Sequence, residues 1–373
     1  MTAAQYLDNS RHRDFAAIGS LSFGLFFLHT LFNGRYGYFV DELYYLACSH
    51  HLDWGYVDQA PLIAVITWFE RVTLGDSLHA LRFLPAVAAG LRVFLTGLIA
   101  RELGARRYAQ VLACVAVIVA PLYLGLDNLL TMNAFEPLFW MGCALIAIKV
   151  IQGANPKLWL LFGVVAGVGL ENKHSMLLFG FAFLVGLLLT PERHLLRSPW
   201  IWLGGILAVA IFLPNLVWEI HRNFPTIELL RNVQRSGRNV SLSSLMFLAE
   251  QLLLMHPLSA PLWISGLWYC FRDAAGRRFR VLGWTYVIIL LCMLVLNGRV
   301  YYMAPAYPML FAAGAVVFQR CVERWSLMWL KPAYLSTLLV TGALLAPFAY
   351  FPLLPVETYI AYSKWAHFGP PKI

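Results

Sequence analysis

The sequence predicts an all-α, polytopic membrane protein, and three observations support this class. The 373 residues are 60% hydrophobic and only 13% charged, with a mean hydropathy of +0.67, whereas soluble domains carry about 25% charged residues. Apolar stretches of about 17 to 25 residues recur along the chain, the length that crosses a hydrocarbon core as a helix. Because backbone exposed to lipid must satisfy its own hydrogen bonds, many such stretches indicate a helical bundle.

About eleven apolar stretches are expected to form the spanning helices, each long enough to cross most or all of the hydrocarbon core. The first follows a polar N-terminal segment and has no small-residue cleavage site, so we expect an uncleaved span. The fifth and sixth are short and are interrupted at "GLENKHS". In chain order the expected spans are 15–34, 80–100, 108–126, 129–150, 158–171, 174–190, 200–219, 244–270, 281–297, 301–319 and 333–352.

Basic residues in the short loops predict that the N-terminus lies inside. With the spans alternating from that start, the inner segments hold "RHR", "RELGARR", "PERHLLR", "FRDAAGRRFR" and "QRCVERW", as the positive-inside rule requires. Most acidic residues fall in the outer segments. The net charge of +9 is therefore largely a topology signal, so membrane lipids are expected partners and nucleic acid is not.

Two outer segments are unusually long. The first, 34–78, contains an apolar stretch after Pro61 that is too short to span and is expected to lie as an interfacial helix. The second, 221–243, carries several arginines and is either solvated or facing anionic headgroups. No internal repeat and no long polar stretch is visible, so residues 1–373 are expected to form a single transmembrane domain.

Neither a disulfide framework nor a zinc site is predicted. The six cysteines stand singly, with no CxxC pair. A divalent metal is an open alternative at one cluster in the first outer segment, although its spacing matches no strong ligand pattern and solvent-facing or structural roles are preferred. That cluster consists of His50, His51, Asp53 and Asp58.

Asp41 and Glu42 stand side by side in "YFVDELYY", directly after the first span. Adjacent acids in such a place are often ordinary solvated loop residues, and that alternative stays open. Their apolar and aromatic neighbours would, however, partly remove them from water. Desolvation of this kind raises the pKa of a carboxylate and suits it to act as a general base.

Further acids lie within or at the ends of expected spans. Asp127 is at the outer end of the third, and Asn133 and Glu136 follow in "TMNAFEPLFW". Residues three apart share a helix face, so Asn133 and Glu136 should project together. An acid inside a span is costly and indicates function, the alternative being a structural hydrogen bond to a neighbouring helix.

Lys173 and Arg299 are lone cations on the outer side, and Arg299 stands beside Tyr301 and Tyr302. Either cation can be explained by snorkelling to the interface. The alternative is that they bind a phosphate. Cations next to a carboxylate base suit displacement of a phosphate leaving group, because they stabilise the charge that develops on the departing oxygen.

The stretch "DELYYLACSHHLDWGYVDQAPLIAVITWFERVTLGDSLHALRFLPAVAAG" closely resembles the first outer loop of bacterial glycosyltransferases of the protein-mannosyltransferase-like group, which include the aminoarabinose transferases that modify lipid A. The pattern there is an Asp-Glu pair, an aromatic helix, D-x-G-Y-x-D-x-P-P-L, G-D-S and L-R-x-P. Ala60 replaces the first of the two prolines. The matching residues are Asp53, Gly55, Tyr56, Asp58, Pro61, Gly75, Asp76, Ser77, Leu81, Arg82 and Pro85.

"TMNAFEPLFW", "GLENKHSMLLFGFAFLVGLLLTP" and "GRVYYMAPAYPMLFAAGA" extend the resemblance over most of the chain. Many relatives carry an Asp where this chain has Asn133, and Glu136 is the candidate for that role. Many also continue into a soluble domain after the last span, whereas this chain stops at "KWAHFGPPKI".

The resemblance implies a GT-C fold in a bacterial inner membrane, with the N-terminus cytoplasmic and the active site periplasmic. It implies an inverting glycosyltransferase that moves a sugar from a polyprenyl-phosphate donor to a lipid, glycan or protein acceptor. The family's catalytic acid maps onto Asp41, with Glu42 orienting it, binding the acceptor or assisting. Lys173 and Arg299 are then expected at the donor phosphate. The expected acceptor or sugar site comprises Asp58, Asp127, Glu136, Tyr301 and Tyr302.

The main rival from another class is a transporter or lipid flippase. Transporters often show two-fold internal repeats with broken helices and polar sites near the bilayer midplane. This sequence shows no such repeat, and its polar residues lie toward the outer ends of the spans. The glycosyltransferase is therefore the favoured function.

Overall fold

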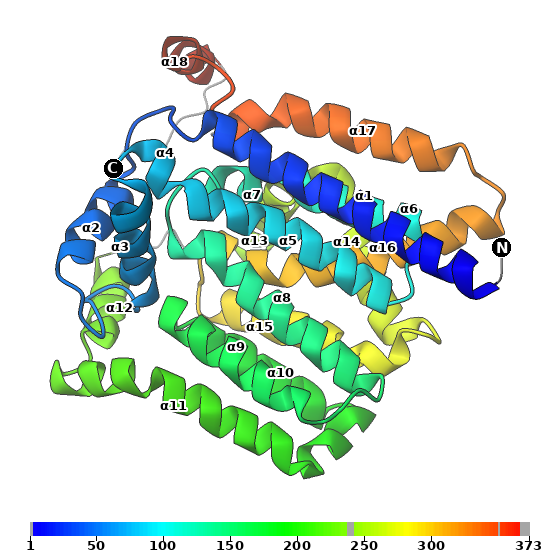
Figure 1. The fold of residues 1–373 in the computed structure, drawn as a ribbon, viewed down its shortest axis with the longest axis horizontal. Helices are drawn as coiled ribbons and strands as arrows, with labels where there is room; N and C mark the ends of the chain where they lie inside the picture. Colours follow the sequence, from blue (N-terminus) through cyan, green and yellow to red (C-terminus); the bar gives the residue numbers. More distant parts are fainter. Residues whose placement is uncertain (1–2, 237–241, 350, 366–373) are drawn as a thin grey trace.

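The computed structural model describes residues 3–236, 242–349 and 351–365, and within them the chain forms helices and no strands (Figure 1). In chain order the helices are α1 (Ala3–Phe32), α2 (Val40–His50), α3 (Leu62–Leu74), α4 (Leu78–Leu81), α5 (Phe83–Glu102), α6 (Arg107–Ile118), α7 (Pro121–Leu126), α8 (Met132–Ile151), α9 (Leu158–Asn172), α10 (Met176–Leu188), η1 (Pro191–Arg197), α11 (Pro199–His221), α12 (Pro225–Arg235), α13 (Ser244–Leu254), η2 (Pro257–Ser259), α14 (Ala260–Arg272), η3 (Arg277–Phe279), α15 (Arg280–Val295), η4 (Val300–Ala306), α16 (Tyr307–Arg324), α17 (Leu330–Leu345), η5 (Ala346–Ala349) and α18 (Val356–Trp365).

The all-α, multi-span class predicted from the sequence is confirmed. Within the described residues, six helices are long and apolar enough to cross a membrane, or eight if each of two sharply bent helix pairs counts as one span. Three shorter apolar helices, α6, α9 and α17, run alongside them. The count of about eleven spans stays a prediction.

One predicted span, 244–270, is wrong as a single straight helix. Helices α13 and α14 meet there at 95°. The break falls at His256, whose φ of 71° lies in the left-handed region, and at Pro257, which begins the next helical segment. Proline has no N–H to continue the helical hydrogen bonds, so the helix is interrupted there. Hydropathy alone does not reveal the bend, because it measures only how apolar the residues are. The stretch 108–126 is likewise divided, into α6 and α7, at Ala120 and Pro121.

Glycine allows the closest helix contacts in the bundle. A Cβ atom built on Gly163 of α9 would lie 2.1 Å from the carbonyl oxygen of Gly204 in α11. On Gly314 of α16 it would lie 1.8 Å from the carbonyl oxygen of Leu262 in α14. Small residues let membrane helices approach backbone to backbone in this way. The Gly163 contact holds α11 beside α9 at the edge of the bundle (Figure 1), and the Gly314 contact holds α16 against α14.

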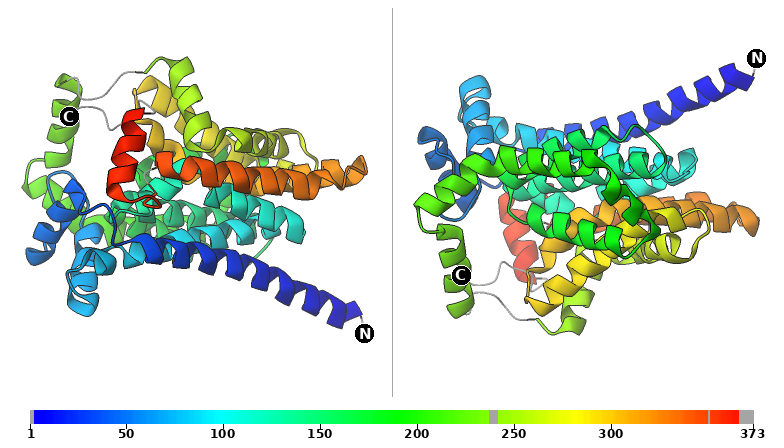
Figure 2. Two further views of the ribbon diagram at one scale, coloured as in Figure 1. Left: turned by 90° about the horizontal axis from the view of Figure 1, so that it is seen from above. Right: turned by 90° about the horizontal axis from the view of Figure 1, so that it is seen from below.

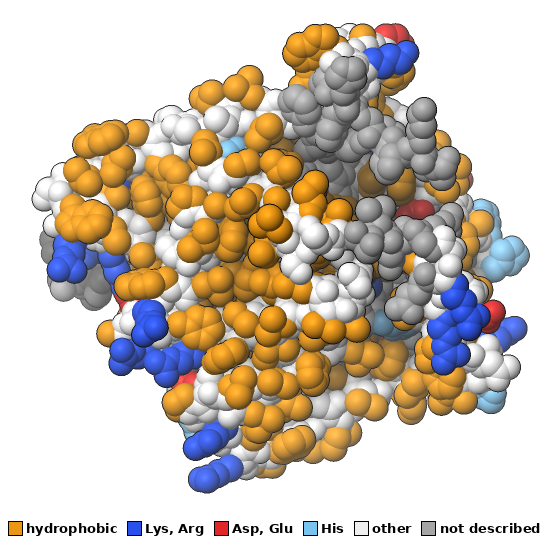
Figure 3. Space-filling view, turned by 180° about the vertical axis from the view of Figure 1, so that it is seen from behind, with side chains coloured by type: hydrophobic (Ala, Val, Ile, Leu, Met, Phe, Trp, Pro, Cys, Tyr) orange, Lys and Arg blue, Asp and Glu red, His pale blue; other side chains and the backbone are white. Residues whose placement is uncertain are grey.

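The bundle has two distinct ends. Helices α2, α3, α4 and α12 gather at one, called here the loop end, whereas the N-terminal part of α1 reaches the other (Figures 1 and 2). The turn after α5 is at the N-terminal end, where Arg107 Nε lies 2.8 Å from Asp14 Oδ1. One face shows an apolar band with Lys and Arg gathered near both edges (Figure 3). The structure thus places the long first loop and the N-terminus at opposite ends of the bundle.

Candidate active site

A small apolar cluster fixes the first loop on the bundle. It is separate from the main core and joins the loop helices α2 and α3 to α5 and α8. Its buried members include Tyr45, Ile63, Leu81, Leu130 and Phe135. Because these side chains come from both the loop and the bundle, burying them sets the position of α2. The acidic pair begins that helix.

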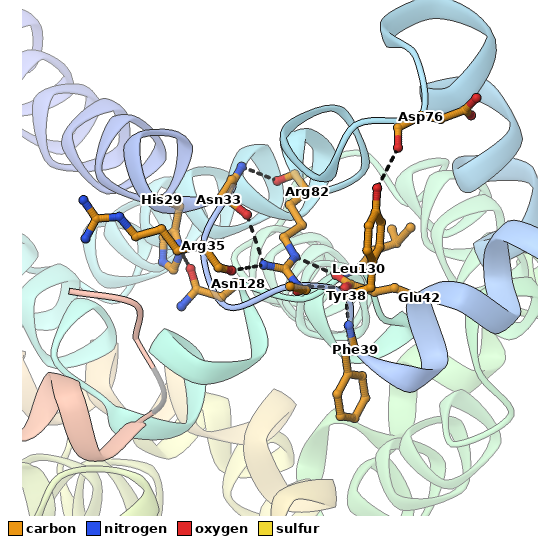
Figure 4. Close-up of polar contacts among 11 residues, drawn as sticks. His29, Asn33, Arg35, Tyr38, Phe39, Glu42, Asp76, Arg82, Asn128 and Leu130 are labelled. Carbon is orange, nitrogen blue, oxygen red and sulfur yellow. Dashed lines mark hydrogen bonds and ion pairs between the residues drawn. The ribbon is translucent and has the colours of Figure 1, made fainter. Parts of the chain in front are cut away.

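Glu42 is fully buried in the first turn of α2 and forms an ion pair with Arg82, which is also buried. The Nε and Nη2 atoms of Arg82 lie 2.7 and 2.8 Å from the two Glu42 carboxylate oxygens (Figure 4). The backbone N–H groups of Phe39 and Leu130 donate to the same oxygens, at 2.8 and 2.9 Å. Arg82 also donates to three backbone carbonyl oxygens, those of Asn33, Arg35 and Gly37.

Both oxygens of Glu42 are therefore occupied, and none is left for an acceptor. That Glu42 binds the acceptor or shares in the chemistry stays a prediction, and these contacts do not favour it. The other expected role, orientation of its neighbour, fits the geometry. Through these hydrogen bonds, Glu42 and Arg82 hold the end of α1, the start of α2 and the segment before α8 together.

Asp41 has the opposite environment, although it is the adjacent residue. Its side chain is exposed, and among the described residues its carboxylate has no hydrogen-bond or ion-pair partner. Partial burial and the nearby Asp58 carboxylate raise the pKa of Asp41, while the Arg299 guanidinium acts in the other direction. Asp41 is thus an accessible carboxylate whose pKa is raised mainly by partial burial and modified by charged neighbours, as suits a general base.

The turn that carries Asp58 is held by α11. The Asn215 side-chain amide donates to the Trp54 carbonyl oxygen at 2.7 Å, and the Trp218 indole donates to Asp53 Oδ2 at 2.8 Å. A Cβ on Gly55 would lie 2.4 Å from the Trp218 ring, so only glycine fits at that position. This explains the glycine of the loop motif.

Asp58 itself is exposed. Burial and the nearby Asp58 carboxylate together raise the pKa of the Tyr44 hydroxyl on α2. The neighbouring Tyr45 lies within electrostatic reach of Asp41, Asp58 and Tyr301. The turn that carries Asp58, the N-terminal part of α2 and the start of η4 therefore lie close together.

Lys173 is not the lone cation that the sequence suggested. Its Nζ lies 2.7 Å from Glu136 Oε2 and 2.8 Å from Asn133 Oδ1, and it sits 4.4 Å from the centre of the Tyr302 ring. The Ser175 hydroxyl donates to the other Glu136 oxygen. The shared face of Asn133 and Glu136 is confirmed, because both bind one ammonium. Glu136 largely compensates the positive charge of Lys173.

Arg299 matches the expectation of an unpaired cation. It is exposed, it caps the start of η4, and its Nη1 is 3.5 Å from the Tyr301 hydroxyl. Among the described residues it has no carboxylate within ion-pair distance, although the charge of Asp41 is near enough to interact with it. Tyr301 and Tyr302 stand edge to face, 4.7 Å between ring centres, and connect Arg299 to the Lys173 pair.

Asp127 is not brought into this group. It is fully buried, pairs with the two terminal nitrogens of Arg92, and faces His29 at 3.8 Å. The Arg92 guanidinium also lies 4.1 Å from the centre of the Tyr123 ring. This network joins α1, α5 and α7 inside the bundle, and it fits the alternative of a structural role for Asp127. A contact of Asp127 with acceptor or sugar stays a prediction.

Sequence reasoning missed the partners Arg82 and Arg92. Each is a single arginine at or inside an expected span, and a lone cation in an apolar stretch is itself a signal that a buried acid pairs with it. As for metals, no group of three or more His, Cys, Asp or Glu side chains comes together in the part of the chain that the structure describes. His50, from the set considered for a metal, contacts Arg71 instead.

Comparisons with known proteins show which proteins this chain resembles in sequence and fold. A family model described as dolichyl-phosphate-mannose-protein mannosyltransferase matches residues 58–218. The lipid A galacturonosyltransferase RgtD of Rhizobium johnstonii is 27% identical over 327 residues, which cover 84% of this chain. The crystal structure of ArnT from Cupriavidus metallidurans bound to undecaprenyl phosphate has the same fold, with a TM-score of 0.69 at 18% identity over 98% of this chain and 69% of that chain. The chain therefore shares the GT-C fold of ArnT and is similar in sequence to glycosyltransferases of the protein-mannosyltransferase-like group.

The GT-C fold extends to a more distant relative. The oligosaccharyltransferase of Archaeoglobus fulgidus, crystallised with Zn and sulfate, has a TM-score of 0.54 at 15% identity, covering 96% of this chain and 54% of that one. The alignment with RgtD spans 66% of that protein's length. The resemblance read from the first loop is confirmed, and the comparisons do not favour a transporter or flippase.

Proposed function

We propose that this GT-C chain, 1–373 as one transmembrane domain, is an inverting glycosyltransferase. It moves a sugar from a polyprenyl-phosphate donor to a lipid acceptor at the periplasmic face of a bacterial inner membrane, with the N-terminus cytoplasmic. One observation carries the proposal: Asp41 is accessible and unpartnered, and the unpaired Arg299 is close enough to influence its charge. The names of two relatives, a lipid A galacturonosyltransferase and a protein crystallised with undecaprenyl phosphate, support the substrate classes.

In this proposal Asp41 is the general base. It takes the proton from an acceptor hydroxyl as that oxygen forms a bond to the anomeric carbon. The bond between that carbon and the phosphate oxygen breaks, and polyprenyl phosphate leaves. Because attack and departure occur on opposite faces of the sugar, the anomeric configuration inverts.

Arg299 then stabilises the charge on the departing phosphate. Arginine suits this role, since its planar fork can bind two phosphate oxygens at once. Lys173 is held beside the same tyrosines but already faces Glu136, so its contribution to phosphate binding is smaller. Asp58, Tyr301, Tyr302 and Glu136 are left to contact sugar or acceptor hydroxyls.

The function is tested by mass spectrometry of envelope lipids from cells with and without the protein. The expected result is loss of a hexose- or pentose-sized increment from one lipid species when the protein is absent. Restoring the wild-type chain, or a Glu228→Gln variant as matched control, should bring the increment back, because Glu228 is an exposed acid of α12 outside the site. Asp41→Asn should not restore it. An unchanged lipid profile in cells lacking the protein would contradict the proposal.

A further inference from the structure

A cavity of about 860 Å³ lies at the loop end, and the proposed chemistry does not use it. Ligand pockets typically measure about 300–1,000 Å³, so this one can hold a substantial ligand. It is bounded by the segment 35–39, by α7 and by α13, with Leu345 of α17 contributing to the wall.

The wall is mainly apolar. Helices α7 and α13 supply proline, leucine and glycine, and no charged residue of α7 reaches the cavity. The apolar residues from these two helices and the start of η2 are Pro121, Leu122, Leu126, Leu253, Leu254 and Pro257. Such a surface favours hydrocarbon over water.

Three charged residues also line the cavity, and they differ in how they are paired. Arg82 is committed to Glu42 and to backbone carbonyls (Figure 4). Arg35 donates only to the carbonyl oxygens of Pro352 and Leu353, so no carboxylate compensates its charge. Glu250 has no hydrogen-bond or ion-pair partner among the described residues. The cavity therefore combines an apolar body with one uncompensated cation and one unpartnered acid.

The cavity is separate from the groups assigned to the donor phosphate. Lys173, Arg299 and the tyrosines of η4 do not line it, whereas Phe39 does. Phe39 stands two residues before Asp41, and the same α2 terminus is pinned by Arg82, another residue of the cavity wall. The cavity thus reaches the N-terminal end of α2, the helix whose first turn carries Asp41.

We propose that this cavity holds hydrocarbon chain of the acceptor, a phosphorylated acyl lipid, with Arg35 binding an anionic group of its head. The inference rests on the proposed function and assigns this cavity to its lipid acceptor. The donor phosphate occupies the Arg299 side, which leaves the cavity as the place from which the acceptor head reaches Asp41. Glu250 accepts a hydrogen bond from a hydroxyl or amine of the same head group.

A matched pair of substitutions on α13 tests the proposal. Leu253 lines the cavity and adjacent Leu252 does not, yet both side chains are exposed, at 58% and 38%. Tryptophan at either position should therefore be tolerated by the fold. Leu253→Trp should displace lipid from the cavity, and Leu252→Trp should not. Each methylene displaced weakens binding about fourfold, so displacing two should raise the dissociation constant about fifteenfold.

Binding is measured on the delipidated full chain by native mass spectrometry, with bisphosphorylated lipid A as the acceptor probe and undecaprenyl phosphate as the donor-carrier probe. Leu253→Trp should weaken lipid A binding and leave undecaprenyl phosphate binding at its wild-type value. If undecaprenyl phosphate binding falls instead, the cavity holds the donor tail and the proposal is overturned. Equal effects of the two tryptophans, or no effect of either, also overturn it.

The head-group contact is tested separately at Arg35. Arg35→Gln should weaken lipid A binding, Arg35→Lys should restore most of it, and lipid A stripped of its phosphates should bind both variants and wild type alike. Unchanged binding of phosphorylated lipid A by Arg35→Gln would overturn this contact. Because binding is measured without turnover, these results do not depend on whether Asp41 catalyses transfer, so failure of the proposed function would be seen separately.

Discussion

Replacing Glu42 by Gln should destabilise the protein, whereas the same change at the adjacent Asp41 should leave stability unchanged. Glu42 is fully buried, and each of its oxygens accepts one N–H of Arg82 and one backbone N–H. Whichever oxygen becomes an NH₂ group, a donor then faces two donors. The buried Arg82 charge also loses its counter-charge.

The cost follows from these contacts. Removing one partner of a buried ion pair costs about 3–5 kcal/mol, because the other charge stays buried and uncompensated. Asp41 is exposed and makes no hydrogen bond in the described structure, and substitutions at such positions usually change stability by less than about 0.5 kcal/mol.

Thermal unfolding of the purified protein in detergent measures the difference. Glu42→Gln should lower the midpoint by about 5 °C or more relative to wild type, given the usual few degrees per kcal/mol. Asp41→Asn should unfold within about a degree of wild type, the shift expected for a surface substitution. Equal midpoints for the two variants would refute the division of this acidic pair into a structural and a reactive member.

Three further predictions concern charge and topology. Because the base must be deprotonated, kcat/KM should fall as pH drops through the pKa of Asp41, and Arg299→Gln should move this acid limb to higher pH, since it removes a charge that lowers that pKa. A shift to lower pH would contradict the proximity of the two groups. Burial raises the pKa of Glu70 from its ordinary 4.5 to about 8. The folded chain therefore retains a proton that the unfolded chain releases, so stability should fall as pH rises between these values, and Glu70→Gln should flatten this dependence of the unfolding temperature. Topology is tested in a background free of other cysteines. The exposed Val57→Cys should react with an impermeant maleimide added outside, whereas Ala274→Cys should react only after permeabilisation. The reverse labelling would contradict the proposed topology.

Hydropathy predicted the membrane class and the placement of most helices, because the length and composition of an apolar stretch are properties of the local sequence. It did not predict the bend at His256, since a bend depends on where proline interrupts the hydrogen-bond ladder and on what packs against the gap. For the same reason the stretch 108–126 reads as one span although Pro121 divides it.

The candidate site was predicted unevenly. Asp41 and Arg299 could be found from composition, since a carboxylate among aromatics and a lone cation stand out in an apolar chain. The roles of Glu42 and Asp127 could not, because they depend on Arg82 and Arg92, and each of these partners lies about forty residues away in sequence. Pairing across that distance is set by tertiary packing. The local sequence therefore does not reveal such a pair. It shows only that an arginine stands in an apolar stretch.

The central claim is that Asp41 is the base for sugar transfer, and its most direct test is turnover by purified Asp41→Asn protein. The assay supplies a polyprenyl-phosphate sugar and a lipid acceptor and measures the glycosylated lipid and the released polyprenyl phosphate. Loss of a positioned base should lower the transfer rate by about 10² or more, with donor binding and the unfolding temperature as in wild type. Transfer by Asp41→Asn at the wild-type rate would contradict the account.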